Sequence, residues 1–103
     1  MRYAIDFAEA AVEDLGSFRA YDRVTILDLI EKNLRYEPAK ESKSRIKALR
    51  GLSRPQFRLR IGDIRVFYDV NGSTVEVLAV VDKTNVSEWL EQEGIPNQNE
   101  EQG

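Results

Sequence analysis

The sequence has 103 residues, of which 42% are hydrophobic and 32% are charged, and its formal net charge is −3. This length and composition fit one small globular domain and exclude collagen-like, coiled-coil and wholly disordered chains. The longest apolar run, Val77–Val81, is far shorter than the roughly 20 residues that cross a bilayer. The first 25 residues carry five acidic side chains and lack the pattern of a secretory signal, so we expect a cytoplasmic protein that spans no membrane.

The residue inventory also limits the chemistry. The chain has no cysteine and no histidine. Disulfides, thiolate nucleophiles and zinc–thiolate sites are therefore excluded, and so are Ser-His-Asp, Cys-His and two-histidine ribonuclease mechanisms. No set of clustered metal ligands is visible either, so we expect no metal ion and no organic cofactor.

The charge is distributed unevenly along the chain. Residues 40–65 carry nine basic side chains against two acidic ones, a net charge of +7, so the remaining residues have a net charge of −10. A basic segment in an otherwise acidic protein is typical of a surface that binds a polyanion. A solvated charged segment without a ligand would have the same composition, and composition alone does not reject this alternative.

The first third of the chain predicts a strand followed by a helical hairpin. Residues 3–7 alternate between apolar and polar side chains, the pattern of a strand with one buried face. The alanine-rich, acidic residues 8–15 favour a short helix that ends at Gly16-Ser17. Apolar residues then recur at spacings of three and four up to Pro38, which predicts a longer helix from about residue 19 to residue 36. We expect the two helices to pack one apolar stripe against a sheet.

Residues 40–54 show no clean period and predict a basic loop with at most a short helical or extended piece. Three stretches of alternating apolar and polar residues follow, separated by Gly62-Asp63 and by Asn71-Gly72. Both dipeptides are typical of two-residue hairpin turns, so we expect a three-stranded antiparallel meander.

The last part of the chain predicts a short helix and a tail. Asn85 and Glu88 resemble a capping box, and Gly94 would end the helix. We interpret Trp89 as the packing anchor of this helix. Residues 1–95 would thus form one α+β domain, and residues 96–103, which are polar and acidic after the first proline, a disordered tail.

The two turns determine which side chains share a face of the meander. The first turn predicts the cross-strand pair Arg60 and Arg65, and the second predicts the pair Tyr68 and Val75. The face toward the helices would carry Phe57, Leu59, Ile61, Ile64, Val66, Tyr68, Val75, Val77 and Ala79. The opposite face would carry Arg58, Arg60, Arg65, Phe67, Glu76, Leu78 and Val80.

Three arginines are thus expected on the face turned away from the helices. Like charges directly opposite each other, such as Arg60 and Arg65, destabilise a sheet by roughly 0.2–1 kcal/mol. A face with a purely structural role would not need this unfavourable pair, so the pair favours a functional role. Guanidinium groups match phosphate oxygens, and the ring of Phe67 would offer a stacking surface for a base. The alternative is a solvated face on which the arginines stack on Phe67 or pair with Glu76.

The stretch FRLRIGDIRVFYDV, with KALRGL before it and VEVLAVV after it, resembles the signature of the RelE/ParE superfamily of bacterial toxin–antitoxin toxins. The order of the predicted elements is also similar over residues 3–90. The resemblance implies a RelE/ParE toxin-like fold with an N-terminal strand, an α-helical hairpin, a three-stranded meander and a short C-terminal helix. RelE-like members cut messenger RNA in the ribosomal A site, whereas ParE-like members inhibit DNA gyrase and cut nothing.

Similarity to the RelE-like branch implies that the messenger 2′-hydroxyl attacks the adjacent phosphate. Arg58 and Arg60 fall where that branch has basic residues that bind substrate and assist proton removal, and Arg65 falls on its phosphate-stabilising arginine. An arginine keeps its proton and is a poor general base, so Lys83 is the one candidate that could titrate. An ordinary surface role for Lys83 stays open.

This sequence departs from the RelE-like pattern near its C-terminus. Where that branch typically has an arginine and then a tyrosine, the chain has Thr84 and Leu90. The departure favours two alternatives to a nuclease. One is a ParE-like gyrase inhibitor, and the other is a degenerate member that binds its antitoxin without cutting RNA.

The favoured hypothesis is a RelE-like, ribosome-dependent messenger RNA endoribonuclease that inhibits translation. Its expected catalytic residues are Arg58, Arg60, Arg65 and Lys83, and its expected RNA-binding residues are Lys47, Arg50, Arg54 and Phe67. The expected partners are a cognate antitoxin and the ribosome with its messenger RNA. A generic RNA-binding domain has no positive support, and the oligomeric state stays open.

Overall fold

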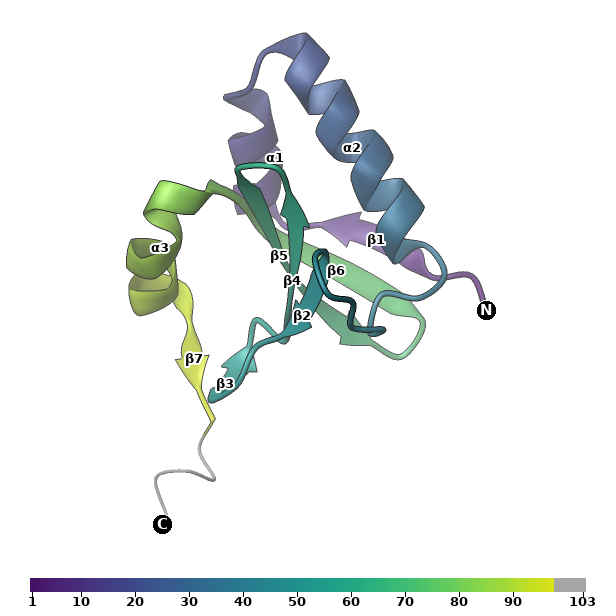
Figure 1. Cartoon of the computed structure of the whole chain (residues 1–103), viewed down its shortest axis with the longest axis vertical. Coiled ribbons are helices and arrows are strands. Elements are labelled where there is room, and N and C mark those ends of the chain that lie inside the picture. The colour runs from purple at the N-terminus through teal and green to yellow at the C-terminus, as the bar shows by residue number, and fades with distance from the viewer. Residues whose placement is uncertain (98–103) are drawn as a thin grey trace.

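The computed structural model of the protein describes residues 1–97 (Figure 1). The elements in chain order are β1 (Ala4–Phe7), α1 (Glu9–Gly16), α2 (Ala20–Leu34), β2 (Ile46–Ala48), β3 (Leu52–Arg54), β4 (Phe57–Ile61), β5 (Ile64–Asn71), β6 (Thr74–Asp82), the 3₁₀ turn η1 (Lys83–Asn85), α3 (Val86–Glu93) and β7 (Ile95–Pro96). The fold is α+β, as predicted. None of the helices within residues 1–97 has the length and apolar character needed to cross a membrane.

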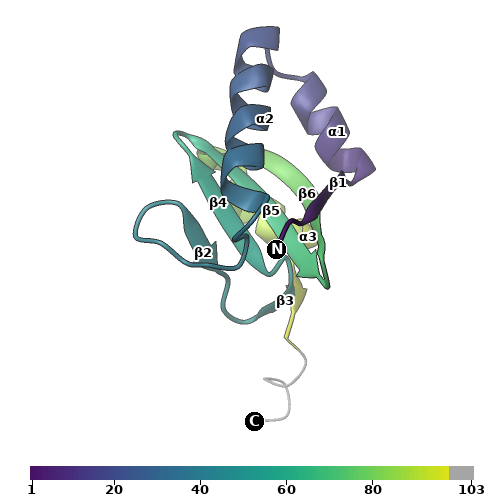
Figure 2. The same cartoon turned by 90° about the vertical axis from the view of Figure 1, so that its right-hand side faces the viewer.

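Most strands belong to one mixed sheet. Its strand order is β1-β6-β5-β4-β2, with β1 parallel to β6 and the other neighbours antiparallel. Strands β3 and β7 form a separate two-stranded ribbon. Helices α1 and α2 cover one face of the large sheet, whereas α3 lies on the other side (Figures 1 and 2).

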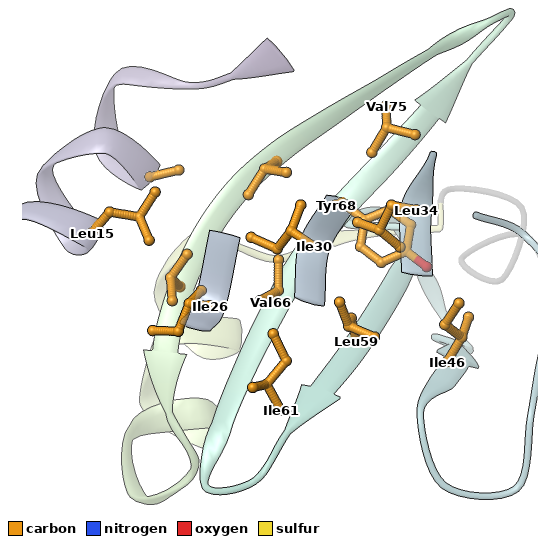
Figure 3. Close-up of a cluster of buried hydrophobic side chains, with 13 residues drawn as sticks. Leu15, Ile26, Ile30, Leu34, Ile46, Leu59, Ile61, Val66, Tyr68 and Val75 are labelled. Atoms are coloured by element: carbon orange, nitrogen blue, oxygen red, sulfur yellow. The ribbon is translucent and has the colours of Figure 1, made fainter. Parts of the chain in front are cut away.

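The main hydrophobic core lies between α1, α2 and the large sheet (Figure 3). Ile26, Ile30 and Leu34 recur every four residues on α2, so they form one stripe, and all three are buried. Tyr68 faces this core, as predicted, and is fully buried. Its hydroxyl donates a hydrogen bond of 2.6 Å to the carbonyl of Pro38, which ties the connection after α2 to the sheet.

The predicted helical hairpin and meander are confirmed, but the basic segment between them contains more structure than expected. Strand β2 adds to the edge of the meander by pairing with β4, and β3 pairs with β7 near the C-terminus. Strands β2 and β3 have three residues each, which is too short for an alternating pattern to be recognised. Their pairing therefore depends on partners that are distant in sequence.

The register of the first hairpin is as predicted, but that of the second is not. Gly72 and Ser73 form the second turn, because Asn71 is already paired with Thr74. Gly72 has a φ of 59°, which suits the first position of a tight primed turn. The sheet partner of Tyr68 is consequently residue 77 rather than residue 75.

A β-bulge changes the face of the sheet on which the later residues of β6 lie. The register shifts between Phe67 and Tyr68, and Phe67 then pairs with Ala79. The extra residue reverses the alternation beyond this point. Ala79 therefore joins the cluster beneath α3 and Val80 joins the main core, so both residues lie on the faces opposite to those predicted.

The C-terminal elements also differ from the prediction in two details. Asn85 makes no side-chain cap; instead, the Asp82 carboxylate caps η1 by accepting a hydrogen bond of 2.9 Å from the backbone nitrogen of Thr84. The expected tail begins too early, because Pro96 is part of β7 and the backbone nitrogen of Asn97 donates to the Gly51 carbonyl. Residues 98–103 of that tail lie outside the described residues.

Candidate polyanion-binding site

The predicted arginines converge on the sheet face that lies away from α1 and α2. Arg58 and Arg60 are two residues apart on β4 and so share this face, and Arg65 on β5 is the direct partner of Arg60. Strand β2 contributes Lys47, which is the direct partner of Arg58. Arg45, just before β2, accepts a backbone hydrogen bond of 2.8 Å from Arg60 and lines a small hollow beside it.

We call these five side chains the cation cluster: Arg45, Lys47, Arg58, Arg60 and Arg65. They come from three neighbouring strands and the residue just before β2, so the cluster forms a short two-dimensional array instead of a line along one strand. Arg45 was not predicted as a site residue. Only the pairing of β2 with β4 brings it beside Arg60, and a three-residue strand carries no usable periodic signal.

Arg58 has the most unfavourable electrostatic environment in the cluster. Its Nε atom is buried and has no hydrogen-bond partner. Desolvation is the largest cause of a lowered pKa for this guanidinium, and repulsion from Arg65 and Arg60 lowers the pKa further. None of the ion pairs within residues 1–97 involves Arg58 or Arg60. The cluster therefore holds positive charge that the described part of the protein does not neutralise at this point.

Arg65 is held in place by the turn that precedes it. Its Nη1 atom donates to the carbonyl oxygens of Gly62 at 2.8 Å and Ile64 at 3.1 Å. These bonds use one nitrogen and leave the outer part of the guanidinium fork for another acceptor. Arg65 is also a minor contributor to the lowered pKa of the Asp82 carboxyl, whose main cause is hydrogen bonding from Thr84.

Lys83 lies close to the same turn, where it forms an ion pair and a backbone hydrogen bond with Asp63. Its Nζ is 3.2 Å from a carboxylate oxygen of Asp63, and its backbone nitrogen donates to the Asp63 carbonyl at 2.7 Å. Both contacts direct Lys83 toward the β4–β5 turn. The arrangement indicates that Lys83 fastens η1 to the β4–β5 turn.

The remaining basic candidates are not gathered at one place. Arg50 is exposed in the turn between β2 and β3. Arg54 lies 3.7 Å from both Asp69 and Glu76, at the end of β5 and β6 that is remote from Arg65. Glu76 is therefore paired with Arg54, and the alternative in which it neutralises the three predicted arginines is not realised.

The expectation of a free stacking surface on Phe67 is wrong. Phe67 is fully buried, and the ring of Trp89 is stacked on it at a centroid distance of 4.7 Å and an angle of 6°. Val86 and Leu90 of α3 pack against the same cluster. The prediction that Trp89 is a packing anchor is confirmed, and its partner is the ring that we had expected to bind a base.

The site consists of guanidinium and ammonium groups, and residues 1–97 contain no group of three acidic, histidine or cysteine side chains that could hold a metal ion. Such an arrangement can bind phosphate oxygens and stabilise charge that develops on them.

Solved structures with a similar fold include RelE toxins, alone or in complex with RelB. The RelE–RelB complex from Pyrococcus horikoshii aligns with 27% identity and a TM-score of 0.65, over 81% of this chain and 97% of that chain. A doubly substituted E. coli RelE in the free state aligns with 25% identity and a TM-score of 0.65, over 85% and 90% of the two chains. The RelB–RelE complex from Methanococcus jannaschii gives 25% identity and a TM-score of 0.63, over 82% and 96%. The fold is thus that of the RelE-like toxins.

A family model matched to the sequence assigns the chain to a family of toxins. The model described as "ParE toxin of type II toxin-antitoxin system, parDE" matches residues 5–85. The chain therefore belongs to the RelE/ParE family of type II toxin–antitoxin toxins, as its sequence signature indicates. No curated protein sequence matches it.

Proposed function

We propose that this toxin is a ribosome-dependent messenger RNA endoribonuclease that uses the cation cluster to bind and activate a phosphodiester. The observation that carries the proposal is the electrostatic environment of Arg58. Its buried Nε lacks an acceptor, and its neighbours Arg60 and Arg65 repel it. A phosphate bound beside the three guanidinium groups would relieve this repulsion, because it places negative charge between them.

In the proposed reaction, the 2′-oxygen forms a bond to the adjacent phosphorus and the bond to the 5′-oxygen of the next nucleotide breaks. The products are a 2′,3′-cyclic phosphate and a 5′-hydroxyl. The 2′-hydroxyl loses its proton to water, and the leaving oxygen takes a proton from water. Arg58, Arg60 and Arg65 donate to the non-bridging oxygens, where negative charge increases in the transition state, so their contribution is positioning and electrostatic stabilisation.

Cleavage of messenger RNA on programmed ribosomes tests this proposal. We expect Arg58→Ala and Arg65→Ala to lower the cleavage rate by roughly 10²–10³-fold, the usual effect of removing one donor that stabilises a developing oxyanion. Lys83→Ala should retain activity within a few fold, because Lys83 is paired with Asp63. Arg19→Ala, at an exposed position before α2, is the matched control. Absence of cleavage by the unaltered protein would refute the proposal.

We also infer a cognate antitoxin as the partner of this toxin. Membership in a toxin–antitoxin family supports this inference, and so does the unneutralised charge of the cation cluster, which an acidic segment would cover. Charge-led docking predicts an affinity that falls as the salt concentration rises. A dissociation constant that is the same at low and high salt would contradict this mode of docking.

A second candidate function is inhibition of a target without cleavage, as in ParE-like toxins. The observation that favours it is chemical: guanidinium groups are poor general bases, and Lys83 is paired with Asp63, so the described residues of the site offer no evident side-chain base. A DNA supercoiling assay with gyrase separates the two candidates. Inhibition of gyrase together with no cleavage on ribosomes would select the second.

A further inference from the structure

The cation cluster continues into a second hollow on the outer side of β2. This hollow has a volume of about 520 Å³ and lies between the end of α2 and the connection that leads to β2. Arg45 lines both this hollow and the smaller one beside Arg60, and Ser44 does the same. The two hollows therefore adjoin at Ser44 and Arg45, just before the edge strand β2.

The wall of this larger hollow is ordered by hydrogen bonds. Figure 2 shows the connection after α2 arching out beside β2. The Ser42 hydroxyl accepts hydrogen bonds from the backbone nitrogens of Arg45 at 3.0 Å and Ile46 at 3.1 Å. The Glu41 carboxylate accepts one of 2.8 Å from the backbone nitrogen of Ala48 on the edge strand. The hollow is thus formed before any ligand arrives, which lowers the cost of binding.

The lining of the hollow combines an exposed ring with cations. Tyr36 is 60% exposed although its side chain is large and aromatic. Lys32, Lys40 and Arg45 line the same hollow, and of the two acids present, Glu37 is 3.5 Å from the ammonium of Lys40. An exposed ring beside cationic groups is the combination with which proteins bind single-stranded nucleic acids.

We propose that this hollow is a subsite for a nucleotide of single-stranded RNA, with the base stacked on Tyr36 and the neighbouring phosphate bound by Arg45. The inference rests on the proposed function in taking RNA as the ligand, and it adds a path for the chain away from the reacting phosphate. Arg65 and Arg60 are direct partners on β5 and β4, and Arg45, just before β2, accepts a backbone hydrogen bond from Arg60. They form a row of cations whose last member, Arg45, lines the same hollow as Tyr36.

An acidic peptide fits this hollow less well than RNA. Its carboxylates would meet Glu37 and Glu41, which line the hollow with the cations. A base, in contrast, presents amino groups that a carboxylate can accept. The mixture of cations, carboxylates and an aromatic ring therefore suits a nucleotide, which has a phosphate, hydrogen-bond donors and a flat face.

The test is binding of a fluorescent single-stranded RNA of about ten nucleotides to the full chain, measured by anisotropy over a range of salt concentrations. We expect Tyr36→Ala to weaken binding at least about fivefold, the lower limit for loss of one stacked base, and Tyr36→Phe to bind like the unaltered protein. Arg45→Gln should reduce the slope of log K against log salt by about 0.7, the value for one phosphate contact on a single strand.

Matched controls lie on the same helix and just before it. Tyr21→Ala removes a tyrosine that is 82% exposed at the opposite end of α2, and Arg19→Gln removes an exposed arginine outside both hollows. Both should leave RNA affinity and salt slope unchanged. Thermal unfolding of every variant checks that the fold is retained.

Three outcomes would overturn the proposal. One is an unaltered protein that does not bind the RNA, and another is RNA binding that is insensitive to both Tyr36→Ala and Arg45→Gln. The third is a pair of variants that bind the antitoxin more weakly and the RNA equally well, which would assign the hollow to the antitoxin. If the expected RNA binding is found but ribosome-bound messenger is not cut, the subsite stands and the proposed nuclease function fails.

Discussion

Replacing Arg58 by methionine separates stability from function in this toxin. The guanidinium has a buried Nε without an acceptor, and like charges surround it. Methionine keeps an unbranched stem for packing and removes both unfavourable features. We therefore expect Arg58→Met to make the free protein more stable while abolishing the activity of the cation cluster.

The size of the effect follows from the structure. An unsatisfied buried donor costs roughly 1–3 kcal/mol. Lys47, directly opposite Arg58 on β2, adds roughly 0.2–1 kcal/mol of like-charge repulsion. Part of this gain is offset because Arg58 is only partly buried and methionine packs differently. A net gain of about 1 kcal/mol remains, which raises the Tm of a domain of this size by roughly 4–8 °C.

Urea unfolding and thermal unfolding of the free protein measure this gain, and the ribosome assay tests for loss of the proposed cleavage. Arg19→Met is the control, because Arg19 is exposed and its replacement should change stability by less than about 0.5 kcal/mol. A destabilisation of about 1 kcal/mol or more by Arg58→Met would refute the reasoning. It would mean that the guanidinium makes favourable contacts in the free protein.

Three further changes test other parts of the fold. Tyr68→Phe should destabilise the protein by roughly 1–3 kcal/mol in urea unfolding, because the buried Pro38 carbonyl loses its donor. Trp89→Ala should cost roughly 2–4 kcal/mol in thermal unfolding, because it uncovers the ring of Phe67. Asp82→Ala should lower the Tm at neutral pH, and the difference from the unaltered protein should narrow as the pH falls below 3.8, because hydrogen bonds hold the pKa of this carboxyl under that value in the folded state.

Each of these expectations has a result that contradicts it. Tyr21→Phe, at an exposed tyrosine, is the control for Tyr68→Phe, and equal effects of the two would mean that the buried hydroxyl contributes nothing. An unchanged Tm in Trp89→Ala would show that α3 is held by other contacts. For Asp82, stabilisation by a carboxyl with a lowered pKa is present above the unfolded-state pKa and is lost as the pH falls through the folded-state value. A difference in Tm that does not depend on pH would contradict this assignment.

Much of the arginine face could be predicted because it depends on short-range information. Gly62 marks the first turn, and the strands on either side of it have a clear alternation, so the pair Arg60 and Arg65 follows directly. The regular apolar spacing on α2 likewise predicts its buried stripe. These features need only residues that are close together in sequence.

The second hairpin shows where local rules fail. Its turn lies one residue later than the Asn-Gly pair suggests, and the bulge near Phe67 adds a residue that reverses the faces of β6. A bulge depends on how two strands fit the surfaces that pack on them. The alternation of β6 by itself therefore does not show that Ala79 and Val80 exchange faces.

The sequence by itself determined the family, the α+β class, the first hairpin and the convergence of Arg58, Arg60 and Arg65. Only the tertiary structure decided that β1 lies parallel to β6, that β2 brings Arg45 into the site, and that Trp89 covers Phe67. The physical reason is the range of the interactions. Turns and periodic stripes are set by neighbours along the chain, whereas short strands and aromatic stacks acquire their partners only when distant segments pack together.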